Sequence, residues 1–179
     1  MRLPVNLPRG RDSALRGRRL TAYEQAVERV ARSRLGAWAF VHAFNPVDRR
    51  LLALTRGRVS LAVGAPVALL ETVGARTGRR RRTPLLYLLD GDDVVVVASN
   101  GGSGRHPAWL HNLRACESVR LLTPERGWRA CRGRVATGAE RARLWALIAD
   151  LFAGYAGYQA RARPREIPVV VLEPISAGS

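Results

Sequence analysis

Residues 67–97 read VALLETVGARTGRRRRTPLLYLLDGDDVVVV. Three apolar runs of strand length alternate here with two turns, one rich in glycine and arginine and one formed by Asp90-Gly91-Asp92. An Asp-Gly pair between apolar runs is a strong signal for a β-hairpin. The sequence therefore predicts strands at Val67–Val73, Arg81–Leu89 and Asp93–Ser99. The last of them holds four consecutive valines, which predicts burial on both faces.

The chain after residue 105 continues the pattern of short elements. Pro107 in its first turn favours a helix over His106–Ala115, and apolar residues at helical spacing predict another over Ala139–Phe152. Further strands are expected at Ser118–Thr123, Trp128–Ala136 and Pro168–Leu172. Short strands in hairpin order with few helices favour a small β-barrel or a sheet sandwich over βαβ winding.

The chain before residue 67 has a different character. Residues 1–20 are rich in Arg, Pro and Gly and predict a flexible basic arm. Residues 21–66 predict a helical segment, in which Thr21–Phe44 is amphipathic. The prediction is thus a flexible basic arm at 1–20, a helical segment at 21–66 and a barrel domain at 67–174.

Composition limits the class of partner. The formal net charge is +16, and all 30 basic residues are arginine. This charge favours anionic partners, namely nucleic acid, acidic lipid or a phosphorylated or carboxylated ligand, although arginine bias is also typical of GC-rich genomes. A hydrophobic content of 47% excludes wholesale disorder.

Cysteine, histidine and hydropathy patterns point to a protein without a metal site. The two cysteines, Cys116 and Cys131, and the three histidines have no zinc-ligand spacing. The sequence shows no secretory signal and no apolar run of membrane-spanning length, which predicts a cytoplasmic protein. The basic amphipathic segment Thr21–Phe44 leaves peripheral contact with the inner face of the membrane open.

The turn between the first two predicted strands concentrates positive charge. Five arginines lie between Arg76 and Arg82, and Gly74 and Gly78 provide a tight turn. Arginine binds phosphate and carboxylate through two parallel hydrogen bonds. The turn alone predicts a polyanion site. It leaves open whether the turn binds a nucleic acid, binds a cofactor or is a solvated basic surface.

Three further segments follow this turn in a particular order: Ala98–Gly102, the run His106–Leu113, and Gly154–Gln159 with Arg165–Val169 after it. Together the four segments resemble the deazaflavin (F420)-dependent nitroreductase family of actinobacteria, over roughly residues 36–174. The resemblance implies an α+β fold, a split β-barrel of about six antiparallel strands related to FMN-binding flavoproteins. It also implies coenzyme F420, whose phosphate and glutamate tail are anionic.

The resemblance also implies roles for single residues. The cofactor-binding residues that it implies are Arg76, Arg81, Arg82, Thr83, Ser99, Asn100, Gly101, Gly102, Pro107, Ala108, Trp109 and Asn112. Arg76 and Arg81 match positions that hold the tail and phosphate. Each residue also has an ordinary interpretation, since a tryptophan such as Trp109 is more often a core residue.

Ser99, Tyr155 and Tyr158 are the implied catalytic residues, as hydrogen-bond donors or a proton route to the acceptor. The tyrosine pair could equally pack beneath the barrel. Asn100 and Ala75 stand where the family often has basic residues, and Phe152 stands where it often has tyrosine. The missing phenol argues against nitroimidazole-type activity.

The resulting hypothesis is an oxidoreductase that transfers a hydride from reduced F420 to a small hydrophobic acceptor, namely a quinone, an enone or a nitroarene. One alternative is an FMN- or FAD-binding reductase on the same fold. Another is a basic nucleic-acid-binding module, although the chain lacks aromatic residues interleaved with basic ones as single-strand binders have. The sequence leaves monomer and homodimer open.

Overall fold

The computed structural model describes residues 54–55, 66–152 and 154–175. The predicted arm at 1–20 and nearly all of the predicted helical segment at 21–66 lie outside this range. The described helices are η2 (a 3₁₀ helix, Asn100–Gly102), α5 (Ala108–Ala115), α6 (Gly138–Leu151) and α7 (Gly154–Ala162). The strands are β1 (Val67–Val73), β2 (Arg80–Asp90), β3 (Asp93–Val97), β4 (Ser118–Thr123), β5 (Gly127–Val135) and β6 (Val169–Pro174).

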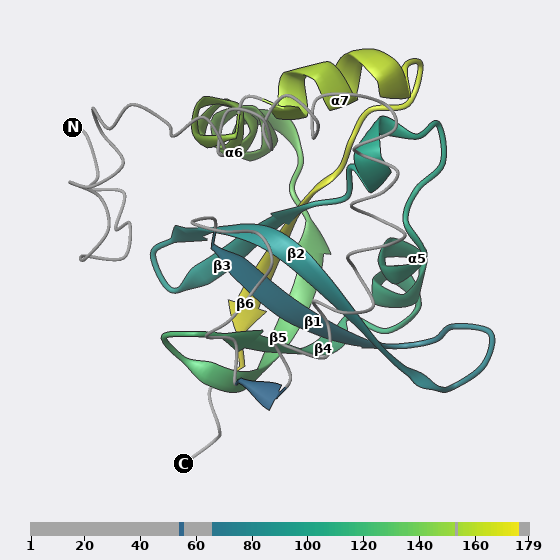
Figure 1. Ribbon diagram of the computed structural model, residues 1–179, viewed down its shortest axis with the longest axis vertical. Helices are drawn as coiled ribbons and strands as arrows, with labels where there is room; N and C mark the ends of the chain where they lie inside the picture. The colour runs from purple at the N-terminus through teal and green to yellow at the C-terminus, as the bar shows by residue number, and fades with distance from the viewer. Residues whose placement is uncertain (1–53, 56–65, 153, 176–179) are drawn as a thin grey trace.

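The six strands form a closed barrel in the order β1-β2-β3-β6-β5-β4 (Figure 1). Every neighbouring pair is antiparallel, including the β1–β4 pair that closes the barrel. Gly91 and Gly127 adopt positive φ at the tight turns that join β2 to β3 and β4 to β5. The barrel prediction is confirmed, and the sheet sandwich is excluded.

Side-chain alternation along β3 divides its valines between two cores. Val94 and Val96 point into the barrel, where they join the cluster that α5 completes with Leu110 and Leu113. Val95 and Val97 point outward into a second cluster, which α6 and α7 cover. The predicted burial of this strand on both faces is confirmed, since Val94–Val97 are all buried.

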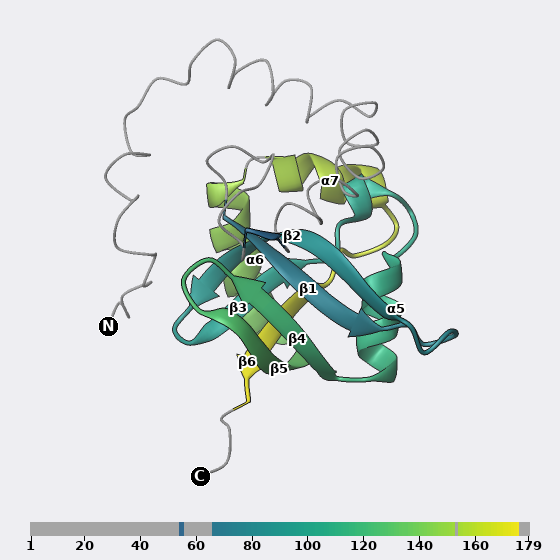
Figure 2. The ribbon, with the colours of Figure 1, turned by 60° about the horizontal axis from the view of Figure 1, so that its bottom comes forward.

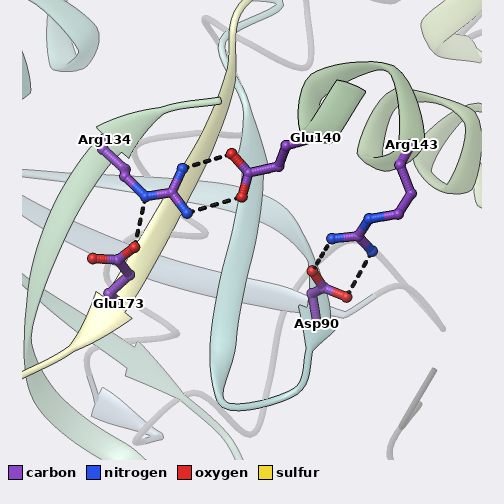
Figure 3. A network of polar contacts seen from close by, with 5 residues as sticks. All are labelled: Asp90, Arg134, Glu140, Arg143 and Glu173. Atoms are coloured by element: carbon purple, nitrogen blue, oxygen red, sulfur yellow. Dashed lines mark hydrogen bonds and ion pairs between the residues drawn. The ribbon is translucent and has the colours of Figure 1, made fainter. Parts of the chain in front are cut away.

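The polar side of α6 is fixed to the barrel by arginine–carboxylate pairs (Figure 3). Arg134 of β5 donates to Glu140 of α6 at 2.7 and 2.8 Å and to Glu173 of β6 at 2.6 Å. Arg143 of α6 donates to both oxygens of Asp90, at the end of β2, at 3.0 and 2.6 Å. These bidentate pairs set the position of α6 and therefore of the following helix, α7.

Element boundaries follow the sequence closely. The predicted strands Val67–Val73 and Ser118–Thr123 coincide with β1 and β4. The expected helix at His106–Ala115 begins later, at Ala108, because Pro107 is its N-cap with extended backbone. The third strand ends at Val97 instead of Ser99, since Ser99 already adopts helical backbone angles as the N-cap of η2.

Leu144 should be one of the residues that hold α6 against the barrel. It is fully buried, so Leu144→Ala should lower the free energy of unfolding by about 2–5 kcal/mol in chemical denaturation. Leu151 lies on the same helix at 46% exposure and provides the matched control, for which Leu151→Ala should change stability by less than about 0.5 kcal/mol. Equal losses in the two variants would contradict the packing described for α6.

Candidate functional site

The segments that carry most of the predicted site residues lie along one side of the barrel. In Figures 1 and 2 the 3₁₀ helix η2, the helix α5 and the β1–β2 turn follow one another down the same side, with α7 next to η2. The glycine loop, the helix start and the arginine turn that the sequence singled out are therefore neighbours in space.

Asn112 joins the arginine turn to α5. Its side-chain oxygen accepts from the backbone N–H of Ala75 at 3.0 Å, and its side-chain nitrogen donates to Oγ1 of Thr72 at 3.1 Å. Asn112 is buried, and its hydrogen bond to Thr72 is shielded from water, whereas the one from Ala75 is partly buried. The turn is closed further by hydrogen bonds from the N–H groups of Thr77 and Gly78 to the oxygen of Gly74. Asn112 thus positions the turn from beneath.

Strand alternation separates the arginines of the turn. Arg81 and Thr83 continue the inward row of Leu85 and Tyr87, which belong to or pack against the barrel core. Arg80 and Arg82 lie on the opposite face of β2. Of the predicted cofactor residues, Arg82 is therefore not brought together with Arg81.

The opposite face carries its own ion network around Glu71 of β1. This carboxylate is 4% exposed, accepts from Arg82 Nε at 2.8 Å and Arg80 Nη1 at 3.2 Å, and lies 3.6 Å from Arg120 Nη1. Burial raises the pKa of the Glu71 carboxyl, but the hydrogen bond and charge of Arg82 and the charges of Arg120 and Arg80 outweigh it and hold that pKa below its usual value. Arg82 and Arg120 also lie over the Trp128 ring.

Three arginines of the turn have no such partner. Arg76, Arg79 and Arg81 are exposed, and within residues 66–152 and 154–175 their side chains make no hydrogen bond or ion pair. They are free to meet an anion from outside the chain. This separation of paired from unpaired arginines is the main electrostatic feature of the site.

Arg165, which lies between α7 and β6, clamps the glycine loop after β3. Its Nη1 donates to the carbonyl oxygen of Ala98 at 3.2 Å, and its Nη2 donates to that of Ser99 at 2.9 Å. Its Nε and Nη2 also donate to the carbonyl oxygen of Ser103, at 3.1 and 2.6 Å. One guanidinium therefore holds both ends of the loop that carries Ser99 and Gly102.

His106 takes part in the same clamp. Arg165 Nη1 lies 3.3 Å from His106 Nδ1, and because arginine only donates, Nδ1 must accept and the ring proton lies on Nε2. Burial lowers the pKa of His106, and the charges of Arg165, Arg114 and His111 lower it further. The ring is accordingly neutral near pH 7, as this hydrogen bond requires.

Gly102 brings the loop against α7. It adopts φ +80°, and a Cβ at this position would lie 3.0 Å from the carbonyl oxygen of Tyr158 and 3.1 Å from Arg161 Nε. Glycine tolerates both this positive φ and the close approach of α7, whereas a larger residue would displace the helix. Asn100 also adopts a positive φ, and its side chain donates to the oxygen of Arg105 at 3.1 Å.

The two tyrosines belong to an aromatic cluster at the α6–α7 junction. Tyr155 packs edge-to-face against Tyr158, Phe152 and Trp145, with ring centroids 5.6, 6.0 and 6.4 Å apart. Tyr155 is 7% exposed, whereas Tyr158 is half-buried. Burial raises the pKa of both phenols, so both stay protonated near pH 7 and can act as donors.

The start of α5 contributes a capped but partly exposed helix end. Pro107 is the N-cap and accepts from the N–H of Leu110 at 3.1 Å, and Ala108 is exposed. Trp109 is only 5% exposed and belongs to the barrel core. Most of the Trp109 side chain is therefore packed in the core, and little of it is accessible to a ligand.

No cluster of metal-ligating side chains occurs in the described part of the chain. This part of the chain also contains no helix that is long and apolar enough to cross a membrane.

Comparison with known proteins identifies the family. Residues 43–174 match a protein-family model described as F420H(2)-dependent quinone reductase. The chain belongs to the F420H(2)-dependent quinone reductase family. It is similar to an F420H(2)-dependent quinone reductase of Mycobacterium tuberculosis, with 41% identity over 122 residues, which cover 66% of this chain and 81% of the relative.

Solved structures give the same picture of this quinone reductase family member. An F420-H2-dependent reductase, FDR-A, is 32% identical and aligns with a TM-score of 0.56 over 60% of this chain and 94% of its own. A domain-swapped dimer is 29% identical, with a TM-score of 0.58 over 72% of this chain and 96% of its own. The predicted resemblance to F420-using barrel proteins is confirmed.

Sequence reasoning missed Arg165, Arg161 and Glu71. Arg165 stood in a segment that carries the resemblance but had no assigned role. Arg161 follows Tyr158 by three residues on α7, a spacing that places both side chains on one helix face. Glu71, a carboxylate inside an apolar strand, was a signal that its charge needs cationic partners.

Arg165→Ala should release the glycine loop. The amide hydrogens of residues 98–106 should exchange faster, and stability should fall by about 1.5–3 kcal/mol, since hydrogen bonds from a charged donor are lost. Hydrogen exchange by mass spectrometry and thermal unfolding measure the two effects. Arg163→Ala, at an exposed position two residues away, is the control and should change neither. Unaltered exchange in Arg165→Ala would show that the clamp does not order the loop.

Proposed function

We propose that this protein reduces a quinone, with reduced F420 as the hydride donor. The observation that carries the proposal is the group of unpaired arginines on the β1–β2 turn, Arg76, Arg79 and Arg81, on the same side of the barrel as the clamped glycine loop. Membership of the F420H(2)-dependent quinone reductase family supports the donor and selects the quinone among the acceptors considered. It also favours F420 over FMN or FAD and over a nucleic acid.

The arginine turn fits the anionic part of F420. A phosphate and a glutamate tail require cationic donors that no carboxylate of the protein already occupies. Arg76 and Arg81 meet this requirement, and Arg79 adds a third free cation. Arg82, bound to Glu71 on the other face of β2, meets it less well. In this proposal Arg76 and Arg81 hold the tail and phosphate, and Asn112 fixes the turn through Ala75.

The ring of the cofactor would lie at the glycine loop and the start of α5. When bound, reduced F420 supplies a hydride from its ring carbon. Ser99, Gly101 and Gly102 form the loop held by Arg165, and Pro107 and Ala108 form the partly exposed helix end beside it. Asn100 is proposed as a loop residue, with its side chain on Arg105. Preorganisation by the clamp would keep the ring and acceptor within reacting distance, roughly 3–3.5 Å.

The acceptor would meet the tyrosine side of the loop. Tyr155 and Tyr158 stay protonated, so they can donate to an oxygen that gains negative charge during reduction. The half-buried Tyr158 is the more accessible of the two, and Ser99 is the third proposed donor. Phe152 packs on Tyr155 without a hydroxyl, which favours a quinone over a nitroimidazole.

Assembly and location stay predictions. One structural relative is a domain-swapped dimer, which supports a homodimer over a monomer. The predicted membrane contact rests on Thr21–Phe44, outside the described residues. Sedimentation of the purified protein and its flotation with anionic vesicles measure the two properties.

The purified protein should quench or shift F420 fluorescence on titration and should reduce menadione with reduced F420. Binding in the micromolar range followed by turnover is the expected result. A protein that binds no F420, or that carries a flavin spectrum after purification, would contradict the proposal.

Arg81→Ala should weaken F420 binding by about 1–3 kcal/mol, since it removes a free charged donor from the turn. Arg80→Ala provides the matched control, because Arg80 is adjacent but directed to Glu71. It should leave the affinity within about 0.5 kcal/mol of the native value. Both affinities come from the fluorescence titration. Equal effects of the two substitutions would indicate diffuse attraction to positive charge instead of a defined contact.

A further inference from the structure

Arg161 differs from the other partly buried arginines of the described chain. Four of these donate to carbonyl or carboxylate oxygens: Arg126, Arg134, Arg141 and Arg165. Arg161 makes no hydrogen bond or ion pair to any described residue, and its Nη2 is buried without a partner. It is therefore a partly buried cation with unused donors.

Arg141 is the other described arginine with a buried nitrogen that lacks a hydrogen-bond partner, but its charge is paired. Its Nε also lacks a partner, but its Nη2 donates to the oxygen of Ile167 at 3.2 Å and its Nη1 pairs with Glu166 at 3.1 Å. The charge of Arg141 is thus neutralised within the fold. The charge of Arg161 is paired with no carboxylate among the described residues.

Arg161 lies where the glycine loop meets the tyrosines. Its Nε is 3.1 Å from the position that a Cβ on Gly102 would take, and its guanidinium carbon is 4.9 Å from the centroid of the Tyr158 ring. Its Nη1 lies 3.5 Å from the corresponding position on Gly157. The glycines at 102 and 157 leave room for this guanidinium beside η2.

This arrangement is costly for the protein alone. Arginine keeps its charge at any physiological pH, so it cannot relieve burial by losing a proton. The contact with Tyr158 engages the face of the ring but leaves the N–H groups of the guanidinium unused. An unsatisfied buried donor in a native fold calls for a partner from outside the chain.

We infer that Arg161 is a ligand-binding residue that donates to a negatively charged oxygen of the bound cofactor or acceptor. This inference rests on the proposed function and adds a residue to its site. The other arginines of the site cannot take this role. The arginine turn lies on the far side of α5, and the donors of Arg165 are already bound to carbonyl oxygens.

Two oxygens have the required chemistry. A hydride that reaches a quinone gives the hydroquinone monoanion, and one proton then completes the hydroquinone. The hydride and the proton together equal the two hydrogens that reduced F420 loses. The anionic oxygen of this product is one candidate partner for Arg161, and an anionic oxygen of F420 itself is the other.

Arg161→Gln tests the inference with three measurements. Without ligand, its thermal midpoint should equal or exceed that of the native protein, because a buried unpaired charge is removed. Either the F420 affinity or the kcat/KM for menadione should fall about tenfold or more, as expected for the loss of a charged hydrogen bond. A weaker F420 affinity in the fluorescence titration would identify the cofactor oxygen. An unchanged F420 affinity with a reduced kcat/KM for menadione would identify the acceptor oxygen.

Two further variants sharpen the comparison. Arg161→Lys keeps the charge without the planar fork and should fall between Arg161→Gln and the native protein. Arg163→Gln removes the same charge from an exposed position two residues away and should behave as the native protein in all three measurements.

The inference is overturned if F420 affinity and menadione kinetics of Arg161→Gln both stay within about twofold of the native values. It is also overturned if Arg161→Gln melts clearly lower or fails to fold without ligand, which would show a structural role. If the native protein reduces no quinone, the proposed function fails, whereas the F420 titration and unfolding of Arg161→Gln still decide the role of Arg161.

Discussion

The guanidinium of Arg165 is the contact on which the candidate site depends most. It follows α7 in the chain, yet its donors bind carbonyl oxygens of Ala98, Ser99 and Ser103 in the loop after β3. The loop has positive φ at three successive residues, Asn100 to Gly102, and its regular structure is limited to the single 3₁₀ turn of η2. A five-donor side chain provides that order from the far end of the sequence.

Pairing within the fold narrows the set of arginines that can bind an anion from outside the chain. Glu71 forms ion pairs with Arg80, Arg82 and Arg120 on one face of the sheet. Carboxylates of α6 and β6 pair with Arg134, and the carboxylate at the end of β2 pairs with Arg143. Among the arginines without a partner in the described chain, Arg76, Arg79 and Arg81 lie together on the turn, and Arg161 is partly buried at the loop.

The sequence predicted the barrel well because its strands are short apolar runs bounded by turn signals, as Val67–Val73 and Ser118–Thr123 show. It also predicted which segments would form one side of the molecule. It did not predict which way the arginines of β2 point, because alternation separates Arg81 from Arg82 without saying which row faces inward. Nor did it predict the clamp, since Arg165 and Ser99 are 66 residues apart.

The interpretation of Trp109 and Tyr155 shows a second limit of sequence reasoning. A motif identifies a residue as part of a site without saying whether it touches the ligand or supports the wall. Trp109 lies in the barrel core, and Tyr155 lies in the aromatic cluster at the α6–α7 junction. Burial separates such supporting residues from Ser99, Ala108 and Tyr158, which keep accessible surface.

Determining a crystal structure of the protein in complex with F420 would test this site most directly. In this complex the anionic tail should contact Arg76 and Arg81, and the ring should lie against the loop held by Arg165, next to Arg161. A cofactor bound instead on the opposite face of β2, over Glu71 and Trp128, would contradict this placement.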